Sequence, residues 1–216
     1  MMPLSLLLQL GVWAQDSVQV NPADYNVEID NAWVRVLRVK HAAHAKIPMH
    51  DHPANVAVFL TDVNERLTGA DGKVQEVHRT AGEVAYSEAA RHEEENLANQ
   101  PVEAILVELK PGAGKSPPVT LDPVVLDPQH HLVPLENNRV RVLRTILEPH
   151  LKGPMHEHPH YVVVYLTELH TTMLLGDGKA VDNPRHPGDV AWRDYMKHQT
   201  ENIGDKEAVE IQIELK

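Results

Sequence analysis

The chain of 216 residues carries two His-x-His pairs, His50 with His52 and His156 with His158, inside the similar stretches PMHDHPANVAVFL and PMHEHPHYVVVYL. Each pair is followed by a run rich in Val, which is typical of a β-strand. Alternate side chains of a strand share one face, so the two imidazoles of a pair are expected to point the same way. Two imidazoles held like this can bind one metal ion.

A third histidine, His92 or His198, follows forty residues after each pair. Three nitrogen ligands leave positions open for water, dioxygen or substrate, as in catalytic rather than closed structural sites. The chain has no Cys, so a metal site must use His, carboxylate or carbonyl groups. The alternative, surface or hydrogen-bonded core histidines, is the more common one for a lone His. The predicted metal ligands are His50, His52, His92, His156, His158 and His198.

The three histidine positions belong to a longer internal repeat. Shifting the chain by 106 residues aligns 25–110 with 131–216 without a gap, with 32 identities in 86 positions. A match of this extent indicates a duplicated unit. The histidines are kept in both copies although about six in ten aligned positions differ, which favours metal binding over the surface alternative.

The segments of each copy favour strands. Val34–Val39, Val56–Thr61 and Val102–Leu109 are short, rich in Val, Ile and Leu, and bounded by turn residues. Asp-Gly at 71–72 and 177–178 predicts a hairpin in each copy. No window has a sustained helical period, so the sequence predicts an all-β protein with one sandwich or barrel per copy.

These motifs resemble those of the cupin family. The His-x-His pairs match the ligand pair of its first motif, and Gly82 with His92 and Asn96 resembles its second, as does Gly188 with His198 and Asn202. The resemblance covers both repeats and implies a bicupin, two jelly-roll-like β-barrels in tandem. Where the family has a Glu ligand the sequence has Val56 and Val162, which excludes a carboxylate ligand at that position. The site is therefore similar to that of cupin-like dioxygenases that use three His.

Other residues near the histidines are candidates for roles in catalysis. Glu95 and Glu201 follow the third His of each copy by three positions and are candidate catalytic bases or groups that orient an imidazole. Solvated glutamates at a strand end are the alternative. His160 shares strand parity with His156 and His158 and is a candidate fourth ligand or proton donor.

Two functions fit the sequence. The first is a metal-dependent enzyme of dioxygenase type that acts on a small molecule, with Fe(II) favoured and Mn, Ni or Zn as alternatives. The second is a non-catalytic bicupin that binds a metal or a small molecule. A cavity beside an open metal position would favour the enzyme, and an interior filled by side chains the structural role. A formal charge of -11 argues against nucleic acid or an anionic membrane as partner. The chain is expected to be a monomer or a homodimer.

The N-terminal stretch MMPLSLLLQLGVWA is apolar, ends in an Ala-x-Ala-like pattern and is shorter than the roughly 20 residues of a membrane span. It predicts an export signal, so that the protein would be periplasmic or secreted; without such a signal it would be cytoplasmic. The predicted domains are a signal peptide over 1–14, a first barrel over 15–110, a Pro-rich linker over 111–129 and a second barrel over 130–216.

Overall fold

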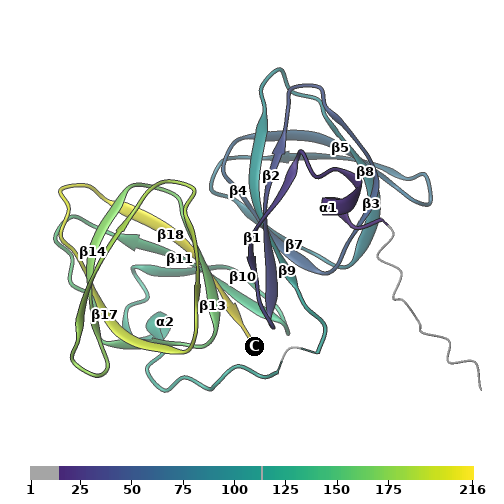
Figure 1. The fold of residues 1–216 in the computed structure, drawn as a ribbon. Coiled ribbons are helices and arrows are strands. Elements are labelled where there is room, and N and C mark those ends of the chain that lie inside the picture. The colour runs from purple at the N-terminus through teal and green to yellow at the C-terminus, as the bar shows by residue number, and fades with distance from the viewer. Residues whose placement is uncertain (1–14, 113) are drawn as a thin grey trace, which may run out of the picture.

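The computed structural model describes residues 15–112 and 114–216. They form two units of the same architecture, which lie side by side in Figure 1. The export signal predicted over residues 1–14 lies outside the described residues. Within the described residues, no helix has both the length and the apolar character needed to cross a membrane.

The first unit consists of one short helix and nine strands. They are α1 (Ser17–Val20), β1 (Tyr25–Asp30), β2 (Val34–His41), β3 (Lys46–His52), β4 (Asn55–Phe59), β5 (Val63–Gly69), β6 (Val74–Arg79), β7 (Val84–Ser87), β8 (Ala90–Asn96) and β9 (Val102–Leu109).

The second unit repeats this order. Its elements are α2 (Pro123–Leu126), β10 (His131–Glu136), β11 (Val140–Leu147), β12 (His156–His158), β13 (Tyr161–Tyr165), β14 (Leu169–Leu175), β15 (Ala180–Arg185), β16 (Val190–Arg193), β17 (Met196–Asn202) and β18 (Ala208–Leu215).

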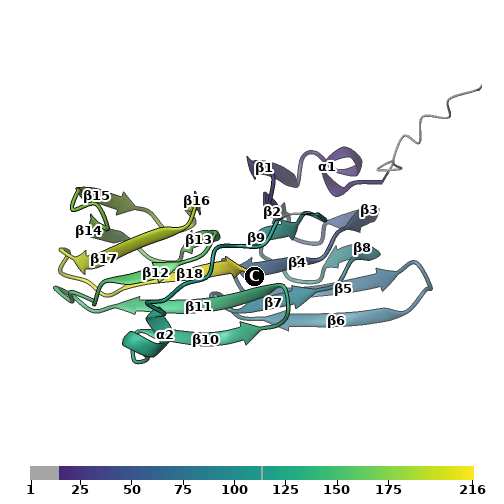
Figure 2. The same cartoon turned by 90° about the horizontal axis from the view of Figure 1, so that it is seen from below.

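In each unit the strands form two antiparallel sheets. The larger sheet has the order β1-β2-β9-β4-β7 in the first unit and β10-β11-β18-β13-β16 in the second. The smaller sheet has the order β3-β8-β5-β6 or β12-β17-β14-β15. Figure 2 shows the strands lengthwise. The prediction of an all-β chain with two tandem units is confirmed.

Both predicted Asp-Gly turns close hairpins, β5–β6 and β14–β15. Gly72 and Gly178 have φ values of 77° and 86°, a left-handed backbone conformation that favours glycine. In the first hairpin, the Asp71 carboxylate accepts a hydrogen bond from the backbone N–H of Lys73 at 3.1 Å.

The second unit begins earlier than the sequence predicted. Helices α1 and α2 occupy equivalent positions of the repeat, and Asp16 and Asp122 cap them by accepting hydrogen bonds from Val18 N and Val124 N. The duplication therefore extends upstream of Tyr25. The connection between the units is shorter than the predicted 111–129, because the last part of that segment belongs to the second unit.

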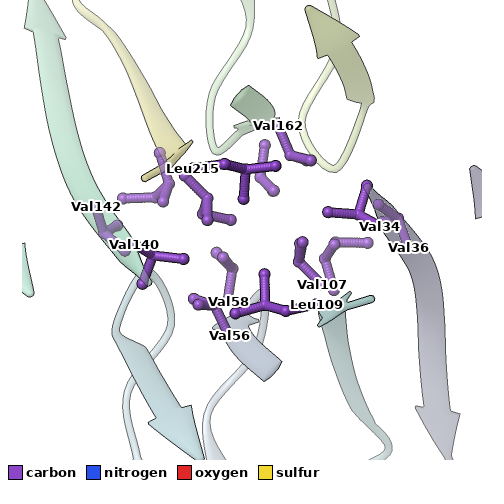
Figure 3. Close-up of a cluster of buried hydrophobic side chains, with 14 residues drawn as sticks. Val34, Val36, Val56, Val58, Val107, Leu109, Val140, Val142, Val162 and Leu215 are labelled. Atoms are coloured by element: carbon purple, nitrogen blue, oxygen red, sulfur yellow. The ribbon is translucent and has the colours of Figure 1, made fainter. Parts of the chain in front are cut away.

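The two larger sheets pack against each other through an apolar cluster of fourteen buried residues drawn from both units. In Figure 3 valines and leucines of the first unit point toward those of the second. Val34 and Val36 of β2 belong to this cluster, whereas Leu37 and Val39 of the same strand face the interior of their own unit. Sheets buried on both faces explain the nearly continuous apolar runs in the sequence.

Candidate metal sites in the two units

The predicted histidines come together in both units. His50 on β3 lies directly across from His92 on β8, and His156 on β12 across from His198 on β17. The second His of each pair is two residues further along the same strand, so its ring shares the inner face. Each group, His50, His52 and His92 or His156, His158 and His198, has ligand atoms within 4.8 Å of one another and could hold a metal ion.

In the first unit the ring nitrogens are oriented by hydrogen bonds. Nδ1 of His50 is 2.8 Å from the carbonyl oxygen of Pro48, and Nδ1 of His52 is 2.9 Å from Oε1 of Glu108. The two Nε2 atoms lie 3.0 Å apart. With the protons on Nδ1, both rings present the lone pair of Nε2 to the same point.

A carboxylate that the sequence did not predict completes the first group. Glu94 on β8 belongs to the same set of converging ligand atoms, and its Oε1 lies 3.0 Å from Nε2 of His92. It faces inward because it is two residues after His92 on one strand. This spacing of two residues is the sequence signal that identifies Glu94 as an inward-facing residue. Val56 lies at the position where the resemblance had excluded a carboxylate ligand, but Glu94 supplies a carboxylate from another strand.

Glu95 and Glu201, the predicted catalytic carboxylates, do not reach the histidines, and this prediction is corrected. Each is an odd number of residues from the third His, so strand alternation turns it to the outer face. Glu95 pairs there with Lys46 at 3.2 Å and Arg66 at 3.1 Å. Glu201 pairs with Lys152 at 2.9 Å.

His160 is likewise outside the second site. Its ring packs against Trp33 of the first unit, with ring centroids 4.5 Å apart, and against Trp192 at 5.8 Å. Pro159 ends the strand before His160, so the alternation that the sequence suggested does not continue. It is therefore a contact between the units rather than a fourth ligand.

Two further buried groups contact Glu94, and a third contacts one of them. Tyr25 donates a hydrogen bond from its hydroxyl to Oε2 of Glu94 at 2.8 Å, and Nε2 of His41 lies 3.3 Å from the same oxygen. Nδ1 of His41 is 2.7 Å from Oε1 of Glu65. The repeat places His131, Leu147, Thr171 and Thr200 at the positions of Tyr25, His41, Glu65 and Glu94. The charged network is therefore specific to the first unit, and the repeat gave no signal for it.

The charges in this network stabilise one another. Although burial acts in the opposite direction, the imidazoles of His92 and His41 hold the pKa of Glu94 well below its usual range. Burial also works against protonation of His41, yet its hydrogen bond with Glu65 and the charge of Glu94 raise its pKa. Burial and the charge of Glu94 raise the pKa of Tyr25, so its hydroxyl remains a donor.

A second layer of charged residues supports both sites. Glu108, which bonds His52, also accepts from Nε of Arg35 at 2.5 Å, and Nη2 of Arg35 donates to Asp16 at 2.6 Å. In the second unit His158, Glu214, Arg141 and Asp122 form the same chain, with contacts of 2.7, 2.6 and 2.7 Å. The sequence contained a signal for it, since the Glu of Glu-Leu-Lys at 108–110 recurs at 214–216.

The second group consists of histidines alone, because Thr200 stands where the first unit has Glu94. His158 Nε2 and His198 Nδ1 are buried without a hydrogen-bond partner within the described residues. Unpaired buried polar atoms are costly, and a bound metal ion would satisfy these nitrogens. His131 lies beside the group, with its ring centroid 5.2 Å from that of His156.

Burial keeps most of these imidazoles neutral. It lowers the pKa of His50 in the first unit and of His156, His158 and His198 in the second. Burial and the neighbouring His156 lower the pKa of His131 to about 4. A neutral imidazole has the lone pair that a metal requires, so the donor sets suit a divalent cation.

The first unit contains a cavity of about 770 Å³ that is open to solvent on one side. His52, His92 and Glu94 line one part of it, together with Tyr25 and His41. Its remaining walls are largely apolar and include Val39, Ala57, Phe59, Leu67, Val77, Ala85, Ala104 and Leu106. A cavity of this size and composition is typical of small-molecule sites.

The interior of the second unit holds larger side chains at equivalent positions. Tyr161 replaces Asn55, Tyr165 replaces Phe59 and Glu210 replaces Ala104. All five residues of β13 are buried, whereas two of the five on β4 are partly exposed. The ring of Tyr161 packs on that of His158, with centroids 4.7 Å apart. The two units therefore differ in access to their histidines.

We expect the buried Glu210 to make stability depend on pH. Burial raises its pKa to about 7 from an ordinary 4.5, against the opposing charges of Arg193 and Arg185 and its hydrogen bond with Gln212. The folded state thus holds this proton more tightly than the unfolded state, and the associated stability is lost between about pH 4.5 and 7. Glu210→Gln should be more stable than the wild type at pH 8, by up to about 3 kcal/mol, and similar to it at pH 4.

Urea denaturation of both proteins across this pH range measures the effect. Exposed Glu207→Gln serves as the control. An equal pH dependence in the wild type and Glu210→Gln would contradict the prediction.

Comparison with known proteins places the fold. No family model and no curated protein matches the sequence. Among solved structures, AerE from Microcystis aeruginosa is similar with a TM-score of 0.60 and 12% identity, over 89% of this chain and 97% of that one. A variant of oxalate decarboxylase from Bacillus subtilis gives 0.57 and 14%, over 93% and 71%. Salicylate 1,2-dioxygenase from Pseudoaminobacter salicylatoxidans gives 0.57 and 10%, over 85% and 68%.

The two sheets of each unit and these similarities define the fold. The chain has the bicupin fold, with two tandem cupin domains. At identities of 10–14% these similarities establish the fold alone.

Proposed function

We propose that the first unit is a metal-dependent enzyme of dioxygenase type that acts on a small organic molecule. His50, His52, His92 and Glu94 would hold the divalent metal, for which Fe(II) is favoured over Mn, Ni and Zn. The observation that carries the proposal is that this ligand group opens into the cavity of about 770 Å³. A substrate in the cavity would lie against the ligands.

Each surrounding residue has a definite task in such a site. A bound divalent metal of this kind supplies a Lewis acid and, for Fe(II), an electron donor toward dioxygen. Tyr25 and His41 hold the carboxylate of Glu94 from the side away from His92. The apolar walls exclude water and accommodate the body of the substrate.

The names of two structurally similar proteins support a small organic acid as the substrate. Two of the similar proteins are, by name, a decarboxylase of oxalate and a dioxygenase of salicylate. Both names describe chemistry on small organic acids. Because the identities are low, the proposal for this chain rests on the ligand group and the cavity.

The second unit is a candidate for the alternative role, a metal site without catalysis. The ring of Tyr161 packs on that of His158, and Tyr161, Tyr165 and Glu210 are bulkier than the residues at the equivalent cavity-lining positions. Three buried imidazoles, two of them with an unpaired nitrogen, would gain from a metal that ties β12 to β17. We therefore expect this metal to stabilise the fold rather than to meet substrate.

Metal content of the purified full-length chain, measured by mass spectrometry, tests both assignments. We expect about two equivalents in the wild type and about one in either His50→Ala/His92→Ala or His156→Ala/His198→Ala. Activity toward small organic acids, screened with Fe(II) under oxygen, should be lost only in the first of these. The exposed pair His170→Ala/His186→Ala is the matched control and should keep both metals.

Two results would contradict the proposal. If no metal binds after reconstitution with Fe, Mn, Ni and Zn, neither unit is a metal site. If activity survives in His50→Ala/His92→Ala but not in His156→Ala/His198→Ala, the roles of the units are reversed.

The buried carboxylates of Glu108 and Glu214, which bind the second histidine of each pair, allow a further test of metal binding. We expect Glu108→Ala to weaken metal binding in the first unit by about 10–100-fold, because His52 loses the acceptor that fixes its Nδ1 proton. The equivalent change Glu214→Ala should have the same effect on the second unit only. Chelator competition against each variant measures the two affinities. Equal weakening of both sites by either change would show a general loss of folding instead.

A further inference from the structure

A second cavity, of about 370 Å³, lies between the two units. Its lining comes from both of them and includes Arg38, Leu60 and Gly82 of the first and Arg144, Leu166 and Gly188 of the second. Phe59 is the one residue that also lines the larger cavity, so the two spaces lie on either side of it. The histidine groups do not contribute to this second cavity.

The arginines reach across the contact in a reciprocal way. Arg38 donates to the carbonyl oxygen of Gly188 at 2.6 Å, and Arg144 donates to that of Gly82 at 3.2 Å. Both glycines have positive φ values, 86° and 85°. A Cβ at Gly82 would come within 3.3 Å of the Arg144 guanidinium, so the close approach also favours glycine.

The two arginines differ in their charge partners. Arg38 is paired with Glu28 and, at 2.7 Å, with Glu103. The repeat places Pro134 and Val209 at the positions of these two glutamates. Within the described part of the chain the side chain of Arg144 has no ion pair, and its only hydrogen bond is the one to Gly82. Arg144 is therefore a half-buried cation at the wall of a cavity, and its guanidinium has N–H groups available for further hydrogen bonds.

We infer that this cavity between the units binds a small organic carboxylate, whose charged group pairs with Arg144. A guanidinium presents two parallel N–H groups that match a carboxylate, and partial burial strengthens the pairing. The charge of Glu103 does not oppose it, because Arg38 already neutralises that carboxylate.

The walls indicate an apolar body on the ligand. Besides the arginines, Glu103 and two threonines, the cavity is lined by apolar side chains: Phe59, Leu60, Ala81, Leu166, Pro187 and Val209. A bare inorganic anion would leave this apolar surface in contact with water. A carboxylate attached to a ring or a short branched chain would cover it, which adds hydrophobic stabilisation to the ion pair.

Calorimetric titration of the full-length protein with benzoate, and separately with inorganic phosphate, tests the inference. We expect benzoate to bind and Arg144→Gln to weaken that binding by at least about 10-fold. Phosphate should bind more weakly than benzoate. Benzoate that enters the larger cavity would be unaffected by Arg144→Gln, so the binding lost in this variant reports on the cavity between the units. The inference does not depend on the proposed enzyme activity.

Two variants control the experiment. Arg139→Gln removes another half-buried arginine that reaches the first unit, through Leu109, but does not line the cavity, and it should bind benzoate as the wild type does. Ala81→Leu fills part of the cavity and keeps the charge, so it should weaken benzoate binding even if Arg144→Gln folds poorly. Wild-type benzoate binding in Arg144→Gln and Ala81→Leu, or no benzoate binding at all, would overturn the inference. If phosphate bound as tightly as benzoate, the inference that the ligand has an apolar body would be wrong.

Discussion

Replacing Glu94 by Gln is expected to lower the affinity of the first unit for its metal by about 10-fold or more and turnover by at least about 100-fold. Glu94 supplies the only carboxylate oxygen among the ligand atoms that converge in the described residues of that unit. An amide is a poorer ligand and carries no charge to balance the cation. It also lacks the charge that pairs with His41, whose Nε2 lies 3.3 Å from the oxygen that accepts from Tyr25.

The neighbouring residue gives a matched control for this prediction. Glu95→Gln makes the same chemical change one position along β8, where the side chain faces outward and pairs with Lys46 and Arg66. It should leave metal affinity and turnover within about two-fold of the wild type, because surface ion pairs contribute little. Chelator competition and steady-state rates measure the two quantities. A larger effect from Glu95→Gln than from Glu94→Gln would reverse our assignment of the inward-facing carboxylate.

Val58→Asp is expected to lower the free energy of unfolding by more than about 4 kcal/mol. Val58 is fully buried in the apolar cluster between the units, among residues of both larger sheets. A carboxylate there would lose its hydration without gaining a partner, and it would also separate the units. Each fully buried Val or Leu of the cluster contributes about 1.5–3 kcal/mol, so loss of their contact affects the whole chain.

Val74→Asp is the control for this change, because the Val74 side chain on β6 is 60% exposed. It should alter the free energy of unfolding by no more than about 0.5 kcal/mol. Urea denaturation of the two variants and the wild type gives the comparison. If Val58→Asp cost less than about 1 kcal/mol, the two units would not be held together by this cluster.

Part of the site followed from strand alternation and the repeat alone. His50 and His52 share a face because they are two residues apart on a strand, and the same holds for His156 and His158. The preservation of His92 and His198 in the two copies singled out the third member of each group. Strand alternation also predicts that Glu94, two residues after His92, lies on the same face as His92. The expectation of Glu95 was wrong because it relied on the repeat, which keeps a glutamate at 95 and 201 on the outer face.

Other members of the site had no local signal. Tyr25, His41 and Glu65 come from β1, β2 and β5 and meet Glu94 of β8 only when the two sheets face each other. Their registers are set by long-range pairing, which the sequence of one strand does not encode. Their absence from the second copy also removed them from any comparison of the repeats.

The sequence by itself determined that the chain contains two copies of one β-rich unit and that each copy brings together three histidines. Those conclusions depend on a repeat and on a period of two, which are local properties. Only the tertiary structure decided that one interior is open and the other filled. The difference arises from single residues on separate strands, such as Ala104 against Glu210 and Asn55 against Tyr161, whose volumes compete for the same space once the sheets pack. Close packing makes that competition decisive, because a cavity remains only where side chains from several strands are all small.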